Sequence, residues 1–366
     1  MEEIPTGILV SALGFALGVI FGATAQRTNF CTMGAISDAV FMGDWNRFRA
    51  WMLAIAVALL GSQILYITGT VDLTTSIYLT PNLGWAGAVI GGLLFGFGMT
   101  LTGGCGNKTL VRLGAGNLKS MVVALFLGIF AYMTLRGLTG LARVELEDAI
   151  NVDLLAFGMA DQGVPALLGL LGVPESPARL IVLVMVAGGL LWFVLKSRDF
   201  RTSKADITGG IIIGLLVPVA WYVTGVIGFD DFEPTPLVSF TFVAPVGESI
   251  QYLMTFTGST INFGIAVVIG VIFGSFVAAK LSGEFRVEAF TDAGDMVRHM
   301  IGGSIMGIGG VMALGCTVGQ GITGMSTLAI GSVLALLSIL FGGYFGMRYL
   351  EEGTFGGALN AVLSRQ

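Results

Sequence analysis

Nine apolar runs, each long enough to cross the hydrocarbon core of a bilayer, divide this chain of 366 residues. They lie at about 4–25, 50–68, 84–103, 120–137, 179–195, 206–228, 261–279, 297–315 and 327–347. Charged residues make up only 11% of the chain, whereas a soluble domain carries about 25%. So few charges cannot cover a water-facing surface. The sequence therefore predicts an all-α integral membrane protein with about nine transmembrane helices, built as a single polytopic domain over residues 1–366.

Four shorter segments lie between these runs, and each follows a break punctuated by glycine or asparagine. They cover 32–43, 107–116, 287–298 and 318–326. Non-helical backbone at membrane depth is tolerated only where protein buries it or where it lines a cavity. We therefore expect four short, re-entrant helices, with interfacial helices outside the membrane as the alternative.

The basic residues predict which side each end of the chain faces. With nine crossings and the N-terminus outside, 15 of the 18 lysines and arginines fall on the cytoplasmic side. Because short cytoplasmic loops carry an excess of lysine and arginine, this pattern favours the orientation. The expected location is the inner (cytoplasmic) membrane of the cell, with the C-terminus in the cytoplasm.

Two stretches of the chain are similar to each other when they are shifted by 211 residues. The glycines and cysteine that then superpose are Gly91, Gly92, Gly96, Gly98, Gly104 and Cys105 on Gly302, Gly303, Gly307, Gly309, Gly315 and Cys316. The segment 18–22 also recurs at 270–274. We expect a first repeat at about 1–137, a central insert at 138–255 and a second repeat at 256–347. Transporters commonly bind their substrates where such repeats meet. Whether the repeat is inverted stays open, and an amphipathic stretch at 148–155 predicts a short interfacial helix in the insert.

The chain has three cysteines, and all three lie beside glycines or polar residues at predicted helix breaks. Glycines there expose backbone N–H groups, and a helix that begins after the break points the positive end of its dipole at the break. Both features favour binding of an anion. The candidate pathway residues are Cys31, Cys105, Cys316, Asn29, Gly104, Gly106, Asn107, Lys108, Arg286, Gly315, Thr317 and Gln320. The alternatives are that the thiols act as small apolar side chains, the cations as ordinary loop charges and the amides as partners for broken backbone.

A buried thiol that stays protonated is a weak hydrogen-bond donor, and weak donors suit a ligand that must leave each station. This chemistry favours a soft, sulfur-bearing anion over phosphate, for which arginine is preferred. Scattered carboxylates and the single His299 give no metal cluster, and no catalytic motif is recognisable. We therefore expect a transporter without cofactor, catalytic residues or nucleic-acid partner. Asp38 and Asp206 do not stand out as proton sites.

The motifs around these cysteines resemble those of the YeeE/YedE family of bacterial membrane proteins. They are the runs 29–31, 103–106, 283–286 and 314–317. The resemblance implies nine spanning helices plus four short ones in a pseudo-twofold hourglass, and thiosulfate import along Cys31, Cys105 and Cys316. It also suggests a cytoplasmic TusA-like sulfur-transfer protein as a partner. Selenium-related transport, a sulfurtransferase that carries persulfide on cysteine, and a structural membrane subunit stay open as alternatives.

Overall fold

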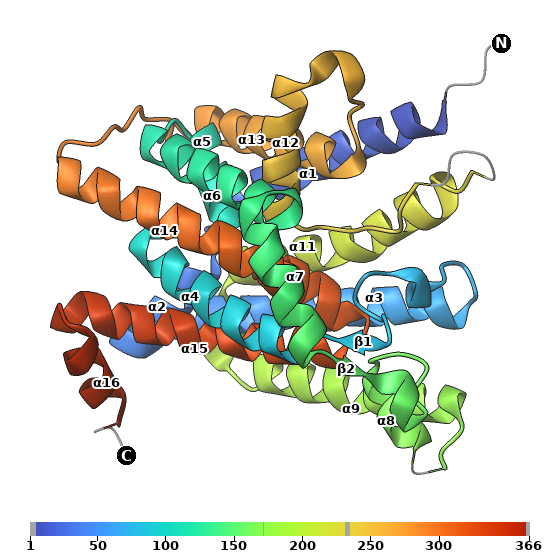
Figure 1. Cartoon of the computed structure of the whole chain (residues 1–366). Helices are drawn as coiled ribbons and strands as arrows, with labels where there is room; N and C mark the ends of the chain where they lie inside the picture. Colours follow the sequence, from blue (N-terminus) through green and yellow to red (C-terminus); the bar gives the residue numbers. More distant parts are fainter. Residues whose placement is uncertain (1–4, 171, 231–234, 364–366) are drawn as a thin grey trace.

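The computed structural model describes residues 5–170, 172–230 and 235–363, and within them the chain forms a bundle of helices (Figure 1). The long helices are α1 (Thr6–Thr28), α3 (Asn46–Ile67), α6 (Leu118–Arg136), α9 (Glu175–Leu195), α11 (Lys204–Tyr222), α13 (Phe263–Ser282), α14 (Ala293–Met312) and α15 (Ile330–Glu352). The shorter ones are α2 (Thr32–Ser37), α4 (Gly92–Leu101), α5 (Gly106–Gly114), α7 (Leu138–Ile150), α8 (Val164–Gly169), α10 (Arg198–Thr202), α12 (Val243–Met254) and α16 (Phe355–Leu363).

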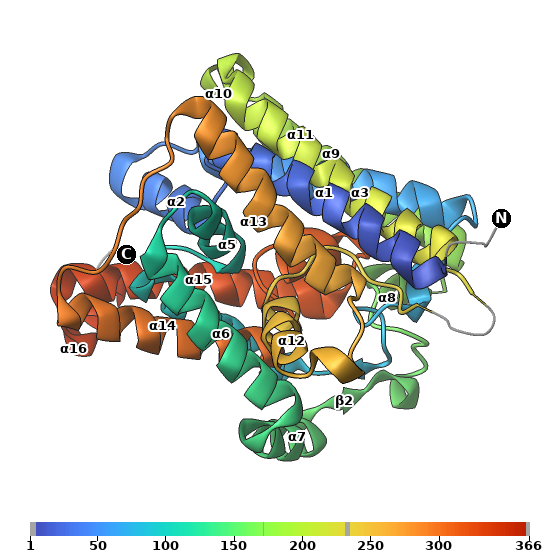
Figure 2. The same cartoon turned by 90° about the horizontal axis from the view of Figure 1, so that it is seen from above.

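Short pieces of other structure join these helices. Wider π-helical turns cover Asp38–Met42, Gly87–Gly91, Val223–Ile227 and Gly319–Gly324, and 3₁₀ turns cover Leu73–Thr75, Leu154–Phe157 and Phe256–Gly258. The strands β1 (Asn82–Leu83) and β2 (Val152–Asp153) form one antiparallel pair. The described termini lie at opposite ends of the long helices in both views (Figures 1 and 2).

Eight stretches of the described chain are long and apolar enough to cross a membrane. They are Thr6–Met42, Asn46–Ile67, Gly87–Gly114, Leu118–Arg136, Glu175–Leu195, Lys204–Ile227, Phe263–Ser282 and Ile330–Glu352. The prediction of a multi-pass, all-α membrane protein is confirmed, but the count of nine apolar spans is corrected to eight. The ninth, 297–315, overlaps α14, which has 20 residues but carries Asp295, Arg298 and His299 near its start and is less apolar.

Glycines set the closest helix contact, between α1 and α13, which run side by side in Figure 2. A Cβ atom on Gly18 would lie only 2.5 Å from the carbonyl oxygen of Val267 and 3.1 Å from the Cα of Gly270. The residues of the recurring segments, 18–22 and 270–274, therefore meet across this contact. In a membrane the hydrophobic effect does not drive helices together, because lipid tails are as apolar as the helix surface. Small residues stabilise helix pairs there because they let the two backbones approach closely.

The glycines that superposed in the sequence also meet each other, between α4 and α14. A Cβ on Gly91 would lie 2.6 Å from the carbonyl oxygen of Gly309, and one on Gly98 would lie 2.7 Å from that of Gly302. α4 also packs on α15, and α14 packs on α6. The contact is antiparallel, because residues at the start of α4 lie against the end of α14 and residues near the end of α4 lie against the first half of α14. Cys105 and Cys316 therefore follow opposite ends of this helix pair.

Three of the four predicted short segments form short helices at the expected places. These are 32–43 as α2 with its π-turn, 107–116 as α5, and 318–326 as the π-turn Gly319–Gly324. The fourth prediction, 287–298, is wrong for a separate short helix, because the chain is not helical through 284–292 and the residues from Ala293 on belong to α14. The stretch 148–155 is not a helix either: α7 ends at Ile150 and β2 follows.

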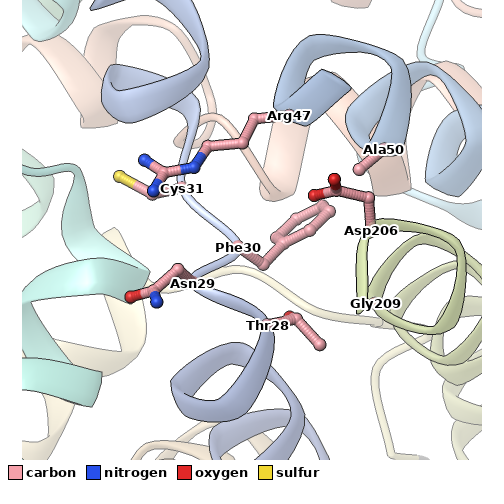
Figure 3. Close-up of a pocket in the computed structure, with 8 residues that line it drawn as sticks. All are labelled: Thr28, Asn29, Phe30, Cys31, Arg47, Ala50, Asp206 and Gly209. Atoms are coloured by element: carbon pink, nitrogen blue, oxygen red, sulfur yellow. The ribbon is translucent and has the colours of Figure 1, made fainter. Parts of the chain in front are cut away.

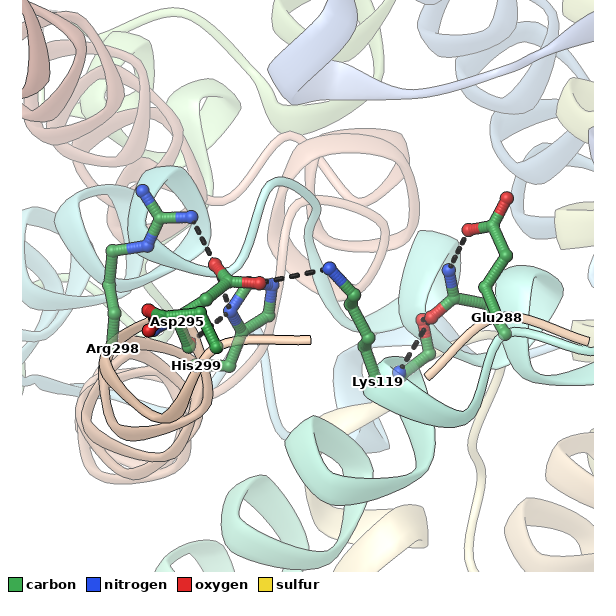
Figure 4. A network of polar contacts seen from close by, with 8 residues as sticks. Lys119, Glu288, Asp295, Arg298 and His299 are labelled. Atoms are coloured by element: carbon green, nitrogen blue, oxygen red, sulfur yellow. Dashed lines mark hydrogen bonds and ion pairs between the residues drawn. The ribbon is translucent and has the colours of Figure 1, made fainter. Parts of the chain in front are cut away.

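A polar network on the surface explains why the segment before α14 is not helical. Lys119 Nζ bonds Asp295 Oδ2 at 2.9 Å, and Asn117 Nδ2 donates to Glu288 Oε2 at 2.7 Å (Figure 4). The backbone N–H of Leu118 also donates to the carbonyl oxygen of Glu288. The start of α6 therefore ties down both ends of this segment.

Asp295→Asn is expected to lower the free energy of unfolding by less than about 1 kcal/mol at neutral pH, because the carboxylate is partly exposed. The hydrogen bond from Lys119 lowers the pKa of the Asp295 carboxyl. Its stabilisation is therefore present above the usual carboxyl pKa of about 4 and is lost as pH falls through the lowered value. Thermal unfolding of both proteins from neutral pH down to about pH 3 checks this. A difference in stability between the two proteins that grows as the pH falls would contradict this prediction.

Candidate functional site

The three cysteines are free and buried, and each one precedes a short helical segment. Cys31 is the N-cap of α2, and its sulfur accepts a hydrogen bond from the N–H of Gly34 (3.5 Å). Cys316 Sγ accepts from the N–H of Gly319 in the same way (3.4 Å). Cys105, the N-cap of α5, instead donates its S–H to Asn107 Oδ1 at 2.6 Å. Helix breaks predicted from sequence thus place all three thiols at the starts of short segments.

The fold gathers the thiols into one cluster. The Cys31 side chain lies beside that of Cys105, and Cys316 lies close enough to interact with Cys105 electrostatically. Thr317 also approaches the Cys105 thiol. Cys105 is therefore the middle member of the set. It is 0% exposed, as is Cys316, while Cys31 is 4% exposed.

One or two residues after each cysteine lies a buried polar side-chain atom that makes no hydrogen bond. In the described part of the chain the buried atoms Thr32 Oγ1, Asn107 Nδ2 and Thr317 Oγ1 make no hydrogen bond. Buried polar groups are nearly always satisfied, and an unsatisfied one costs about 1–3 kcal/mol. Three such groups beside three thiols indicate a place where a polar ligand supplies the missing partners.

Cations surround Cys31. Lys108 is 9% exposed, and its Nζ donates to Asn29 Oδ1 at 3.3 Å. Arg112 lies near both Lys108 and Cys31, and Arg47 lies near Lys108. Figure 3 shows the Arg47 guanidinium beside the Cys31 thiol, in a narrow crevice that leaves essentially no free volume.

Arg47 and Arg112 were missed by the reading of the sequence. Arg112 is four residues after Lys108 and so lies on the same face of α5, a spacing that could have signalled it. Arg47 begins α3, and only the fold brings it to Cys31. It forms an ion pair with Asp38 through its Nε atom, 3.2 Å from Oδ2.

Two consecutive glycines shape the turn before α5, and the second of them, Gly104, belongs to the predicted set. Gly103 has φ of 69°, which a residue with a side chain rarely adopts. A Cβ on the next residue, Gly104, would lie 3.2 Å from Lys108 Cγ, so the bare glycine leaves room for the lysine stem. Gly106 faces Phe242 and Leu127.

A vestibule of about 730 Å³ opens at the end of the bundle where α1 and α13 begin. Its lining includes Thr241, and a Cβ on Gly319 would lie 2.6 Å from Thr241 Oγ1. The wall of the vestibule thus contacts Gly319, which lies three residues after Cys316 in the sequence. Asp230 and Glu248 also line it, so its wall carries acidic groups.

Aromatic rings fill the space between the vestibule and the crevice. Phe21 lies 5.4 Å from Phe240 and 5.1 Å from Phe242 between ring centroids, and all three rings are buried. Along the chain, the start of α1 lines the vestibule, Phe21 follows within α1, and Cys31 comes three residues after α1 ends. Phe240 and Phe242 belong to a non-helical segment, 235–242, that enters the core before α12.

The other predicted residues have structural partners. Gln320 donates to the carbonyl oxygen of Ala313 and accepts from Ser332 Oγ at 2.6 Å, so it satisfies broken backbone near Gly315. Arg286 is exposed, and its backbone N–H donates to the Ala115 carbonyl oxygen at 3.2 Å. None of the described contacts of Arg286 involves a cysteine, so the structure does not bring it to the thiols.

Comparison with known proteins found a family model and several relatives that match this chain. The family model described as "Sulphur transport" matches residues 27–345. The thiosulfate transporter TsuA of Escherichia coli is 28% identical over 84% of this chain and 86% of its own length. TsuA of Spirochaeta thermophila is 28% identical over 90% of this chain and 96% of its own.

A shorter match joins them. The probable transporter YedE of Escherichia coli is 38% identical over 27% of this chain and 24% of its own length. All three relatives are named as transporters, which agrees with the prediction of a transporter rather than an enzyme. The family match covers most of the chain, and the chain therefore belongs to the sulphur transport (YeeE/YedE) family.

Proposed function

We propose that this protein imports thiosulfate, or a closely related sulfur-containing anion, along a pathway lined by Cys316, Cys105 and Cys31. The observation that carries the proposal is the cluster of three buried, free thiols, each followed by a buried polar atom that lacks a partner. The two relatives that match most of the chain are named thiosulfate transporters, which supports thiosulfate as the substrate.

In this pathway the anion enters the vestibule, passes Thr241 to reach Cys316, and moves to Cys105 and then to Cys31. Each S–H holds it weakly, so no station binds it too tightly to release it. Displacement of the phenylalanine side chains opens the route. The cationic crevice beside Cys31 is the exit.

The same proposal includes the orientation and the repeat. The N-terminus lies outside and the C-terminus in the cytoplasm, as the distribution of basic residues favours. Two related portions of the chain, 1–137 and 256–347, supply Cys105 and Cys316, which is supported by the reciprocal glycine contacts of α4 and α14. A TusA-like protein that receives the sulfur compound from the exit is the proposed cytoplasmic partner.

The test is uptake of radiolabelled thiosulfate by cells that lack their own sulfate and thiosulfate importers. The wild-type protein is expected to support uptake that sulfate competes for poorly, and a variant with all three cysteines changed to alanine is expected to support none. Equal uptake by both proteins at equal membrane levels would reject the thiol pathway. Stronger competition by a selenium analogue would move the substrate class from sulfur to selenium.

A second candidate is a sulfurtransferase, which the cations beside Cys31 favour because they stabilise an anionic persulfide. There a cysteine thiolate attacks the outer sulfur of thiosulfate, the S–S bond breaks, and sulfite leaves with the electron pair. The cysteine persulfide keeps one negative charge. Mass spectrometry of the protein after turnover distinguishes the two, since a persulfide on any of the three cysteines would support transfer, and unmodified thiols support transport.

A further inference from the structure

We propose that Arg47, Lys108 and Arg112 form an anion-binding site at the inner end of the pathway, and that Arg47 is its gate residue. In this scheme Arg47 exchanges its partner, from the Asp38 carboxylate to the oxygens of the leaving anion. The inference rests on the proposed function, because it describes how the imported anion leaves the thiols.

The three cations converge from two elements on one thiol. Lys108 and Arg112 lie one turn apart on α5, near Cys31. Arg47 reaches the same place from α3, where a Cβ on Gly34 would lie 2.6 Å from Arg47 Nη1 and 3.7 Å from Cys31 Cβ. Figure 3 shows the Arg47 guanidinium beside the Cys31 thiol.

Their charges are only partly neutralised by the protein. In the described residues neither Lys108 nor Arg112 forms an ion pair, and the partner of Lys108 Nζ is the neutral Asn29 amide. Arg47 pairs with Asp38, Asp206 lines the same crevice, and Asp44 lies near Asp38, so the carboxylates lie on the Arg47 side. Lys108 is 9% exposed and has no carboxylate partner among the described residues, and a buried, uncompensated cation is costly unless an anion joins it.

The polar atoms on this side point to an oxyanion. Thr32 Oγ1 and Asn107 Nδ2, beside Cys31 and Cys105, are buried and without partners. A guanidinium binds two oxygens of one oxyanion at once, and an ammonium binds as a point charge. The cations and amides would hold the oxygen-bearing end of thiosulfate while the thiols contact its terminal sulfur. The site thus recognises a dianionic oxyanion, a class that includes sulfate.

The position of Arg47 makes it the gate of this site. Its side chain is 39% exposed, whereas Cys31 is 4% exposed, so the guanidinium covers the thiol. The crevice leaves essentially no free volume in this conformation. An anion can leave past Cys31 only after Arg47 moves, and the Asp38 carboxylate 3.2 Å from Arg47 Nε draws the guanidinium back.

If Arg47 exchanges Asp38 for the anion, substitutions of Arg47 and of Asp38 should have opposite effects on the affinity for the anion. Arg47→Gln removes a charge from the site, so thiosulfate should bind about tenfold more weakly, the equivalent of about 1.4 kcal/mol. Asp38→Asn leaves Arg47 free for the anion, so binding should become several-fold tighter while release and net uptake slow. A purely structural role of the ion pair would shift both variants the same way.

The experiment measures thiosulfate and sulfate binding to the purified full-length protein in lipid nanodiscs by calorimetry. Uptake is measured in parallel in cells. Arg298→Gln is the matched control, because it removes one arginine from an exposed ion pair with Asp295 on the surface, and we expect wild-type binding from it. Arg47→Lys keeps the charge and should fall between wild type and Arg47→Gln. Size-exclusion chromatography confirms that each variant is folded, and Arg47→Lys replaces Arg47→Gln if the latter is not.

Two results would overturn the inner site: Arg47 variants that bind both anions as Arg298→Gln does, or Asp38→Asn and Arg47→Gln that both weaken binding. Failure of the proposed function looks different, since the wild-type protein would then not transport thiosulfate. The sulfate arm would still report whether Arg47 and Asp38 act on an oxyanion with opposite sign.

Discussion

Replacing Cys105 with alanine is expected to lower the initial rate of thiosulfate uptake at least about tenfold, with the protein still folded and in the membrane. Cys105 lies near both Cys31 and Cys316, so in the proposed pathway it is the station between the other two. Alanine removes the S–H donor, so the buried Asn107 Oδ1 loses its 2.6 Å hydrogen bond and keeps only the one from the Lys108 N–H. The measurement is the initial rate of radiolabel uptake at equal membrane levels.

Cys105→Ser is the matched control for this prediction. Serine keeps a small donor that reaches Asn107, but its hydroxyl is a stronger and harder donor than a thiol, so partial uptake is expected. Wild-type uptake by the alanine variant would show that the thiol cluster is not on the route. The same substitution at Cys316 and at Cys31 should also reduce uptake, because the three stations act in series.

Gly18→Val is expected to destabilise the bundle by roughly 3 kcal/mol or more, which is at the upper end for overpacking a close contact. The new Cβ would lie 2.5 Å from the Val267 carbonyl oxygen and 3.0 Å from the Cα of the same residue. Both are backbone atoms, so no rotamer change relieves the clash, and α1 and α13 must separate. Thermal unfolding followed by size-exclusion chromatography measures the loss of folded protein.

Gly188→Val in α9 provides the comparison, since it makes the same change within a helix. A Cβ there meets nothing within 4 Å, and valine has a better helix propensity than glycine. We expect this variant to unfold at or slightly above the wild-type temperature. Equal unfolding temperatures for the two variants would contradict the view that the α1–α13 contact depends on bare backbone.

The sequence was sufficient to predict those features of the fold that have a one-dimensional pattern. Apolar runs determine spanning helices because a bilayer requires length and apolarity, and the matched glycines predicted which stretches are alike. The non-helical segment 235–242 and α12 were hidden in what looked like an outer loop. Phe240 and Phe242 are buried through contacts with α1, and such tertiary burial leaves no local period in the sequence.

The same distinction applies to the candidate site. The cysteines and their neighbours Asn107, Lys108 and Thr317 follow from short motifs at helix breaks. Arg47 is distant in sequence from Lys108, and only the packing of α3 places it in the crevice. Arg286 was predicted because it takes the place of Cys31 in the second repeat, but the chain before α14 is tied to the start of α6, which keeps Arg286 at the surface.

The buried rings of Phe21, Phe240 and Phe242 and the filled crevice at Cys31 also bear on the speed of the proposed transport. In the proposed pathway an anion passes neither place in this conformation, so side chains must be displaced at both for every ion that crosses. The turnover number is therefore expected to be limited by these motions and to lie well below the flux of an open channel.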